Sequence, residues 1–119
     1  MTEPQPVTIT ERNGHLVIAV MTSTIGPRES VEIVAAAADA IGNGDRRGKC
    51  MVIDLSRVSL LPSMGLGTCI DLHNRALDRG MQSVVFGLNN HLSDLFKLMR
   101  VDRLFRTASS AAELERILS

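Results

Sequence analysis

The 119-residue chain has no tryptophan, no tyrosine and only three phenylalanines. Proteins that bind single-stranded nucleic acid usually stack bases on aromatic rings, so this class of function is disfavoured. The charges also balance, because 13 lysines and arginines are matched by 13 aspartates and glutamates. The totals therefore imply no basic surface for nucleic acid. Phe86, Phe96 and Phe105 are better interpreted as core residues.

Long apolar runs are also lacking, and the first residues do not show the charged and then apolar layout of a signal peptide. We therefore expect a cytoplasmic protein. The only two cysteines, Cys50 and Cys69, lie in apolar segments, and we expect buried thiols rather than a disulfide. Neither their spacing nor the scattered histidines His15, His73 and His91 fit a metal site. We expect no metal and no cofactor.

The length and the 45% hydrophobic content are those of one domain with a real core, spanning residues 1–119. Residues 1–6 contain two prolines and are expected to form a flexible lead-in. Asn13-Gly14 lies between two apolar segments and predicts an antiparallel hairpin with a type I′ turn. Helical and strand-like segments then alternate, which predicts parallel strands joined by crossovers. The predicted fold is a single α/β domain with a mixed sheet of about five strands and about four helices.

The first predicted helix begins at Pro27, where a missing N–H costs nothing, and ends at about Ile41 before two glycines. Its predicted inward face consists of Val31, Val34, Ala35, Ala38 and Ile41. The polar segment at residues 45–49 is interpreted as a solvated loop rather than a phosphate site.

The last third of the chain predicts two strands and two helices. Residues 81–86 form a buried strand, and a short edge strand is expected at residues 104–106. A helix over about residues 91–99 has one apolar face, consisting of Leu92, Leu95, Phe96 and Met99. The last helix begins at Ser110, which forms a capping box with Glu113. It buries Leu114, Ile117 and Leu118.

Residues 50–80 are the most informative stretch. Residues 50–56 hold an apolar run rich in β-branched side chains, which predicts a central strand buried on both faces with Asp54 near its carboxyl end. An amphipathic helix follows and ends at Gly80. Its predicted stripe consists of Leu66, Cys69, Ile70, Ala76 and Leu77. Ser63 falls at the predicted N-cap.

A hydroxyl at an N-cap has two possible roles. It can accept a hydrogen bond from a backbone N–H of the first turn, and losing that bond costs about 1 kcal/mol. It can instead be phosphorylated, because free N–H groups and the positive end of the helix dipole would hold a phosphate. The residue types alone favour the cap at Ser63, since serine is among the preferred N-cap residues.

The segment Asp54-Leu-Ser-Arg-Val-Ser-Leu-Leu-Pro-Ser-Met-Gly-Leu-Gly resembles the signature of STAS domains, the anti-sigma factor antagonists of bacteria. The usual form is D-L-S-x-V-x-x-[IM]-D-S-[ST]-G-[LI]-G. In that family the serine after the second aspartate is phosphorylated by a partner anti-sigma factor that is also a kinase, and it corresponds to Ser63. Pro62 replaces the acidic residue and Met64 the second hydroxyl residue. A carboxylate that could orient the hydroxyl is therefore missing.

The later helix and the residues after it also resemble the family, from Asn90 to Phe105. Val101 stands where glycine is common. The similarity covers most of the chain, although only residues 54–67 are diagnostic. The resemblance implies the STAS fold, in agreement with the alternation of helices and strands.

An enzyme is not expected. No triad or Cys-His arrangement has supporting local spacing, and Gly65-Leu-Gly67 continues into neither a dinucleotide motif nor a P-loop. Each of these glycines sacrifices about 1 kcal/mol of helix propensity relative to alanine. We interpret them as bare backbone that lets another surface approach closely. The start of this helix is thus a predicted docking surface.

The resemblance implies an anti-sigma factor antagonist, a switch that binds an anti-sigma factor with serine kinase activity and is controlled by phosphorylation of Ser63. The predicted partner-binding residues are Pro62, Ser63, Met64, Gly65, Asp54, Asn89 and Asn90. An alternative is a scaffold or adaptor STAS domain in a larger signalling assembly, which is not phosphorylated and which Pro62 favours. Small-molecule or lipid-linked binding occurs among STAS relatives, but no residue of the sequence indicates it. The sequence does not determine the oligomeric state.

Overall fold

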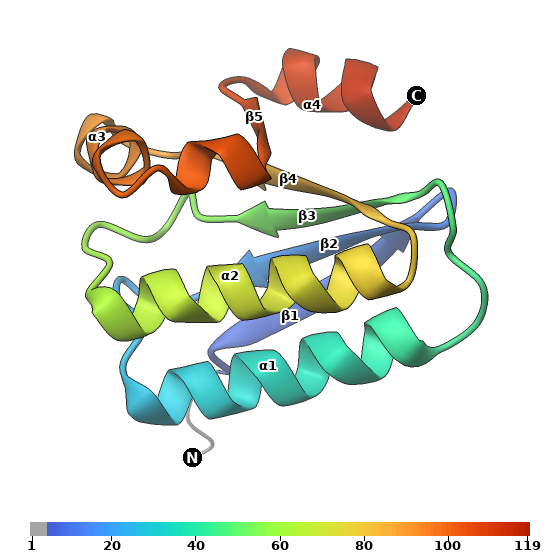
Figure 1. The fold of residues 1–119 in the computed structure, drawn as a ribbon, viewed down its shortest axis with the longest axis horizontal. Helices are drawn as coiled ribbons and strands as arrows, with labels where there is room; N and C mark the ends of the chain where they lie inside the picture. The colour runs from blue at the N-terminus through green and yellow to red at the C-terminus, as the bar shows by residue number, and fades with distance from the viewer. Residues whose placement is uncertain (1–4) are drawn as a thin grey trace.

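The computed structural model of the chain describes residues 5–119. Five strands form one mixed sheet in the order β1-β2-β3-β4-β5 (Figure 1). The strands are β1 (Val7–Arg12), β2 (His15–Val20), β3 (Cys50–Asp54), β4 (Gln82–Phe86) and β5 (Arg106–Ala108). The helices are α1 (Pro27–Gly42), α2 (Ser63–Asp78), α3 (Asn90–Leu98) and α4 (Ala111–Leu118), with the short 3₁₀ helix η1 (Val101–Leu104). The predicted α/β class is confirmed.

The predicted hairpin and crossovers define the topology. Asn13 and Gly14 have φ angles of 54° and 87°, as the predicted type I′ turn requires, and β1 and β2 pair antiparallel. The pairs β2–β3, β3–β4 and β4–β5 are all parallel. The carboxyl ends of β2, β3 and β4 therefore lie at one edge of the sheet, where α2 also begins (Figure 1).

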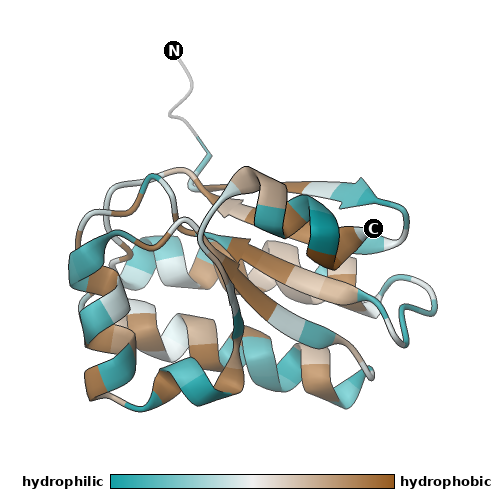
Figure 2. Ribbon diagram, turned by 90° about the horizontal axis from the view of Figure 1, so that it is seen from above, coloured by the Kyte–Doolittle hydropathy of each residue, from teal (hydrophilic) through white to brown (hydrophobic). Residues whose placement is uncertain are grey.

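Both faces of the sheet are covered, which explains why β3 is apolar at nearly every position. The helices α1 and α2 cover one face and α4 the other (Figure 1). Met51 and Ile53 of β3 belong to the larger core under α1 and α2, whereas Cys50 and Val52 belong to a smaller cluster with Leu114 and Leu118 of α4. The inner strands are strongly hydrophobic, and the helices mix hydrophilic and hydrophobic residues (Figure 2).

The residues before β1 were predicted to be a flexible lead-in. Residues 1–4 of that segment lie outside the described residues. Pro6 is buried, and its carbonyl accepts a hydrogen bond from the N–H of Met21 at 2.8 Å. Among residues 5–119, no helix has the length and the apolar composition needed to cross a membrane.

The predicted helices are present, but two of their inward faces differ from the predicted stripes. In α1 the buried residues are Ile33, Ala37 and Ile41, while Val31 and Ala35 are exposed. In α2 the stripe continues through Leu72 and Ala76, and Leu77 is exposed. The predictions for Val31, Ala35 and Leu77 were wrong because both helices have more apolar residues than inward positions. A helix with several alanines can turn either of two neighbouring faces toward the core, because alanines bury little apolar surface on either face. Ile41, Leu66, Cys69 and Ala76 are buried as predicted.

The predicted helix ends are mostly confirmed. Gly80 has a φ of 71°, and α2 ends in a Schellman motif in which Met81 N–H donates to Ala76 O and Gly80 N–H to Leu77 O. The Ser110 hydroxyl caps α4 by accepting a bond from the Glu113 N–H at 3.1 Å. The reciprocal half of that capping box is different, because the Glu113 carboxylate accepts bonds from Ser109 rather than Ser110.

The segment after α3 differs from its prediction. Met99 is the exposed C-cap of α3 rather than part of its buried face, while Leu92 and Phe96 are buried as predicted. The helix η1 occupies residues 101–104, so β5 begins at Arg106, two residues later than the predicted strand. Arg100 adopts the left-handed conformation with a φ of 58°, which lets the buried Val101 start η1.

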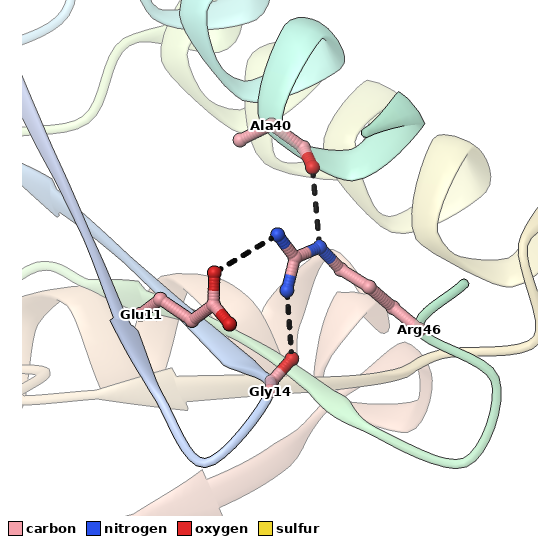
Figure 3. Close-up of polar contacts among 4 residues, drawn as sticks. All are labelled: Glu11, Gly14, Ala40 and Arg46. Carbon is pink, nitrogen blue, oxygen red and sulfur yellow. Dashed lines mark hydrogen bonds and ion pairs between the residues drawn. The ribbon is translucent and has the colours of Figure 1, made fainter. Parts of the chain in front are cut away.

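The polar connector between α1 and β3 is not simply solvated, as had been predicted. Arg46 donates to Ala40 O at the end of α1, to Gly14 O of the hairpin turn and to the Glu11 carboxylate, at 3.2, 3.0 and 3.2 Å (Figure 3). Only 11% of its side chain is exposed. Arg46 therefore holds the hairpin turn against the end of α1.

Candidate functional site

Three loops meet at the edge where β2, β3 and β4 end. They comprise residues 21–26, 55–62 and 87–89, and together with the first turn of α2 we call them the rim. The N–H groups of Ser59 and Leu60 both donate to Ser23 O, at 2.9 and 3.3 Å. The N–H of Leu55 donates to Phe86 O at 2.9 Å. These backbone bonds join the first loop to the second, and the second loop to the end of β4, where the third loop begins.

The loop after β3 and the loop after β4 are in close contact. Gly87 has a φ of 79°, and a Cβ added there would lie 2.6 Å from the Cβ of Ser56, so only glycine fits. Asn89 fastens the same two loops, because its Nδ2 donates to Val58 O at 3.5 Å and to Ser59 O at 3.4 Å. Its Oδ1 also accepts the Leu92 N–H at 2.7 Å, which caps α3. Asn89 is thus first of all a positioning residue of the rim.

The other predicted partner-binding residues occupy distinct places on the rim. Asp54 is half-buried at the end of β3, and its Oδ1 accepts the Ser56 N–H at 2.9 Å, which turns the chain out of the strand. Asn90 is the exposed first residue of α3. Pro62, Ser63 and Met64 are exposed at the start of α2. The bonds between the loops bring these positions onto one edge of the sheet.

Ser63 is not the N-cap of α2. Pro62 occupies that position with φ −67° and ψ 170°, the extended conformation of an N-cap, and no side chain caps the helix. The predicted cap was wrong by one residue because the helix begins directly after the proline. Ser63 is therefore the first helical residue, and its side chain is exposed. It lies at the end of α2 where no side chain caps the backbone N–H groups.

Two apolar side chains accompany Ser63 on the exposed surface. Leu60 is 60% exposed and Met64 is 48% exposed, whereas Leu61 between them is buried. Leu60 is not among the residues predicted from the sequence to bind a partner. The pair Leu60-Leu61 could have predicted an exposed leucine at this position. Neighbouring residues in an extended segment point in opposite directions, so only one of the two can enter the core.

The two glycines in the first turns of α2 have different environments. Gly65 is buried, and a Cβ there would lie 2.6 Å from Leu61 Cδ1 and 3.2 Å from Ile25 Cβ. The interpretation of Gly65 as backbone left bare for a partner was therefore wrong, since the protein's own core fills that space. A Cβ on Gly67 would have no atom within 4 Å, and Gly67 is exposed. Only Gly67 offers open backbone.

Both cysteines are buried, and two of the three histidines are hydrogen-bonded within the fold. Both thiols are free and buried, as predicted, and burial raises the pKa of Cys69 to about 12. The Nδ1 of His15 accepts the Cys50 N–H at 2.9 Å, and His73 is bonded to the Ser83 hydroxyl at 2.8 Å. Among residues 5–119, no group of three or more potential metal ligands is present.

Comparison with known proteins gives consistent results for sequence and fold. The family model of the STAS domain matches residues 10–114. An anti-sigma-factor antagonist (STAS) domain protein from Planctomyces limnophilus superimposes with a TM-score of 0.79 at 14% identity, over 95% of this chain and 97% of that one. The Bacillus cell fate determinant SpoIIAA in its phosphorylated form gives a TM-score of 0.70 at 13% identity, over 93% and 98% of the two chains. A chain from the stressosome, described as a signal integration and transduction hub, gives 0.71 at 20% identity over 92% and 95%.

Proposed function

The chain belongs to the STAS domain family, and on this premise we propose that it is an anti-sigma factor antagonist switched at Ser63. In its unmodified state the rim docks on an anti-sigma factor with serine kinase activity and so frees a sigma factor. Phosphorylation of Ser63 by that partner ends the complex. The function is binding, and the chain itself catalyses no reaction.

The observation that carries this proposal is the position of Ser63. Ser63 is the exposed first residue of α2 and corresponds to the serine that is phosphorylated in the family. Its side chain does not cap the helix. The exposed Leu60 and Met64 supply apolar contact area beside it. Interfaces commonly bury such adaptable apolar groups near their centre, and methionine is enriched there. The neighbouring rim residues Asp54, Asn89 and Asn90 would supply polar contacts around this centre.

The phosphate would act on the complex more than on the free domain. It adds between about −1.5 and −2 charges at pH 7. In the free domain this charge lies beside the uncapped N–H groups at the positive end of α2, and the first turn of α2 has no acidic residue to repel it. In a packed interface the same charge would lose its water without a guaranteed partner. The phosphorylated domain is therefore expected to fold normally and to bind weakly.

The decisive experiment combines phosphosite mapping with binding. Protein purified from its native host is mapped by mass spectrometry, and the anti-sigma factor kinases of that host are tested for binding to wild type, Ser63→Ala and Ser63→Asp. We expect phosphate on Ser63, constitutive binding by Ser63→Ala and weak binding by Ser63→Asp. Ser119→Ala is the matched control, because Ser119 is an exposed serine that follows α4 and lies outside the rim. It is expected to bind and to be phosphorylated like wild type.

A scaffold or adaptor role without phosphorylation is the second candidate. Pro62 favours it, because a carboxylate that could orient the serine hydroxyl is missing. The same variants separate the two functions. A scaffold would bind its partners equally well with alanine and with aspartate at residue 63, and the native protein would have no phosphate there.

A further inference from the structure

The strand β1 is one edge of the sheet and leaves one row of its backbone groups unpaired (Figure 1). In a hairpin with a two-residue turn, the residues that flank the turn and every second residue from them bond to the neighbouring strand. The bond from Met21 N–H to Pro6 O continues this alternation past the start of β1. The N–H and C=O groups of Val7, Ile9 and Glu11 therefore point away from β2. No hydrogen bond within residues 5–119 uses these outward groups.

The two edges of the sheet differ in their protection against pairing with another chain. Open edge strands are usually very short or carry charges, prolines or bulges. The other edge strand, β5, has three residues and begins with the exposed Arg106. The strand β1 has six residues, pairs with β2 without a bulge, and has neither a charge nor a proline from Val7 to Thr10. Its two charged residues lie at its end, where Glu11 and Arg12 each form an ion pair within the chain.

The position of Glu11 selects the direction in which a second copy of the chain can pair with this edge. In a parallel pair in register, Glu11 would lie beside Glu11 of the second copy, and like charges on neighbouring strands are destabilising. In an antiparallel pair centred on Ile9, Glu11 lies opposite Val7 of the second copy. The outward N–H and C=O groups of both strands then face one another along the pair. The charge pattern of β1 therefore fits the antiparallel arrangement.

The same arrangement also matches the side chains of β1. It places Thr8 opposite Thr10 of the second copy, and both threonines are exposed on their face of the sheet. Cross-strand pairs of threonines stabilise antiparallel strands. On the other face Ile9 meets Ile9 of the second copy, beside the larger core against which Val7 and Ile9 are packed. The pair is related to itself by a two-fold axis, so it closes as a dimer rather than growing into a fibre.

We propose that a second copy of this chain pairs with the free edge of β1, which gives a two-fold dimer with one continuous antiparallel junction between the two sheets. The outward groups of Val7, Ile9 and Glu11 bond to those of Glu11, Ile9 and Val7 of the second copy. None of these residues belongs to the rim, so each copy keeps its own Ser63. The proposal goes beyond the function proposed for Ser63 and does not rest on it.

Sedimentation equilibrium at up to about 1 mM protein measures the association, because a dimer with a millimolar Kd is still populated there. We expect a reversible equilibrium between monomer and dimer for the wild type. Amide hydrogen exchange at the same concentrations locates the interface. The amides of Ile9 and Glu11 should exchange more slowly as the dimer forms, whereas those of Thr8 and Thr10, already bonded to β2, should change less. A protein that stays monomeric, or a dimer that leaves the amides of Ile9 and Glu11 unprotected, would overturn the proposal.

Charged residues at the paired threonines test the register. The double variant Thr8→Lys/Thr10→Lys places lysines opposite lysines of the second copy and should weaken dimerisation about tenfold. Thr8→Glu/Thr10→Glu should weaken it similarly. An equal mixture of the two variants should form a heterodimer, because every lysine then lies opposite a glutamate. Undiminished dimerisation of either variant alone, or no heterodimer in the mixture, would contradict this register.

Thr107→Lys is the matched control, because Thr107 is an exposed threonine of the opposite edge strand. It should dimerise like wild type, and its failure to do so would place the interface at β5 and overturn the proposal. Thr8 and Thr10 are exposed, so their variants are expected to fold, which circular dichroism checks. Ser63→Asp should also dimerise like wild type, so this result is separate from the function of the rim.

Discussion

The hydroxyl of Ser30 on α1 lies 2.6 Å from the hydroxyl of Thr68 on α2. Thr68 donates its own proton to Met64 O at 2.8 Å, so Ser30 must be the donor to Thr68. The Ser30–Thr68 bond joins the first turn of α1 to the second turn of α2, and the Thr68–Met64 bond connects this contact to the first turn of α2. Thr68 is buried, so this contact supports the start of α2 from inside the fold.

Replacing Thr68 tests that support. Thr68→Val keeps the shape but removes the hydroxyl, which leaves Ser30 without its partner in a partly buried place. We expect a loss of about 1–2 kcal/mol in the free energy of unfolding. Thr68→Ser keeps the hydroxyl and should recover much of this loss. Urea denaturation followed by circular dichroism measures both, and equal stability of the two variants would contradict the role given to the hydroxyl.

Alanine substitutions at the two glycines of α2 should change the stability of the protein in opposite directions. Gly67→Ala adds a methyl group in open space and should stabilise the protein by about 0.5–1 kcal/mol, because alanine is the better helix former. Gly65→Ala gains the same propensity but pushes a methyl group against Leu61 and Ile25 in the core. The cost of overpacking is about 1–3 kcal/mol, so this variant should be less stable than wild type.

Chemical denaturation of both variants under one condition is the measurement. If Gly65→Ala were stabilised as much as Gly67→Ala, the space beside Gly65 would be free after all. That result would restore the interpretation of Gly65 as an open docking position.

Stability also separates the two roles considered for Ser63. Because Ser63 is not a cap, Ser63→Ala should change the free energy of unfolding by less than about 0.5 kcal/mol. Asn89→Ala removes a true N-cap as well as the bonds to the neighbouring loop, so it should cost about 1–2 kcal/mol. Thermal denaturation of the two variants is the test. A loss at Ser63→Ala as large as that at Asn89→Ala would mean that the serine hydroxyl does cap α2.

Local rules predicted much of the fold. Asn13-Gly14 predicts its turn because both residues tolerate positive φ, and Ser110 predicts the start of α4 because its hydroxyl can accept the Glu113 N–H. The buried central strand follows from the apolar run of β3. The family motif located the start of α2 to within one residue. In each of these cases the deciding interaction is local in the sequence or concerns a single strand.

The features that the sequence did not predict depend on contacts between distant segments. The inward phase of α1 depends on how it packs against α2 and the sheet, and its alanines are compatible with more than one phase. Arg46 belongs to a polar stretch, and only the fold brings it to the turn at Gly14.

Arg46 should contribute more to the free energy of unfolding than its charged neighbour Arg47. Arg46→Gln loses bonds to two backbone carbonyls and to Glu11, which should cost about 1–3 kcal/mol. Arg47→Gln is the matched control, since Arg47 is 79% exposed and is paired with Asp45 alone, so its loss should cost less than about 0.5 kcal/mol. Urea denaturation compares them. Equal effects would show that Arg46 does not hold the hairpin turn against α1.

His15 should make stability depend on pH. Its Nδ1 accepts the Cys50 N–H, which only an unprotonated nitrogen can do. Burial, together with the nearby charge of Lys49, lowers the pKa of His15 below its usual value, and a backbone hydrogen bond at Leu118 opposes this only partly. The unfolded chain therefore binds a proton more readily than the folded chain does. The stability from this group is complete above about pH 6.5 and is lost as the pH falls toward the folded pKa.

The variant His15→Asn isolates this effect, because an asparagine oxygen can accept the Cys50 N–H and does not titrate. Free energies of unfolding are measured by urea denaturation at pH 7.5 and pH 5.5 for both proteins. Wild type should lose more stability than the variant over this interval, with a difference of at most about 1.4 kcal/mol per pH unit for one proton. Hydrogen bonds with Arg47 lower the pKa of Asp45, and hydrogen bonds with Ser109 lower the pKa of Glu113. Both carboxylates therefore stay ionised in both proteins over this range. Parallel pH profiles would mean that His15 takes up its proton without disturbing the bond to Cys50.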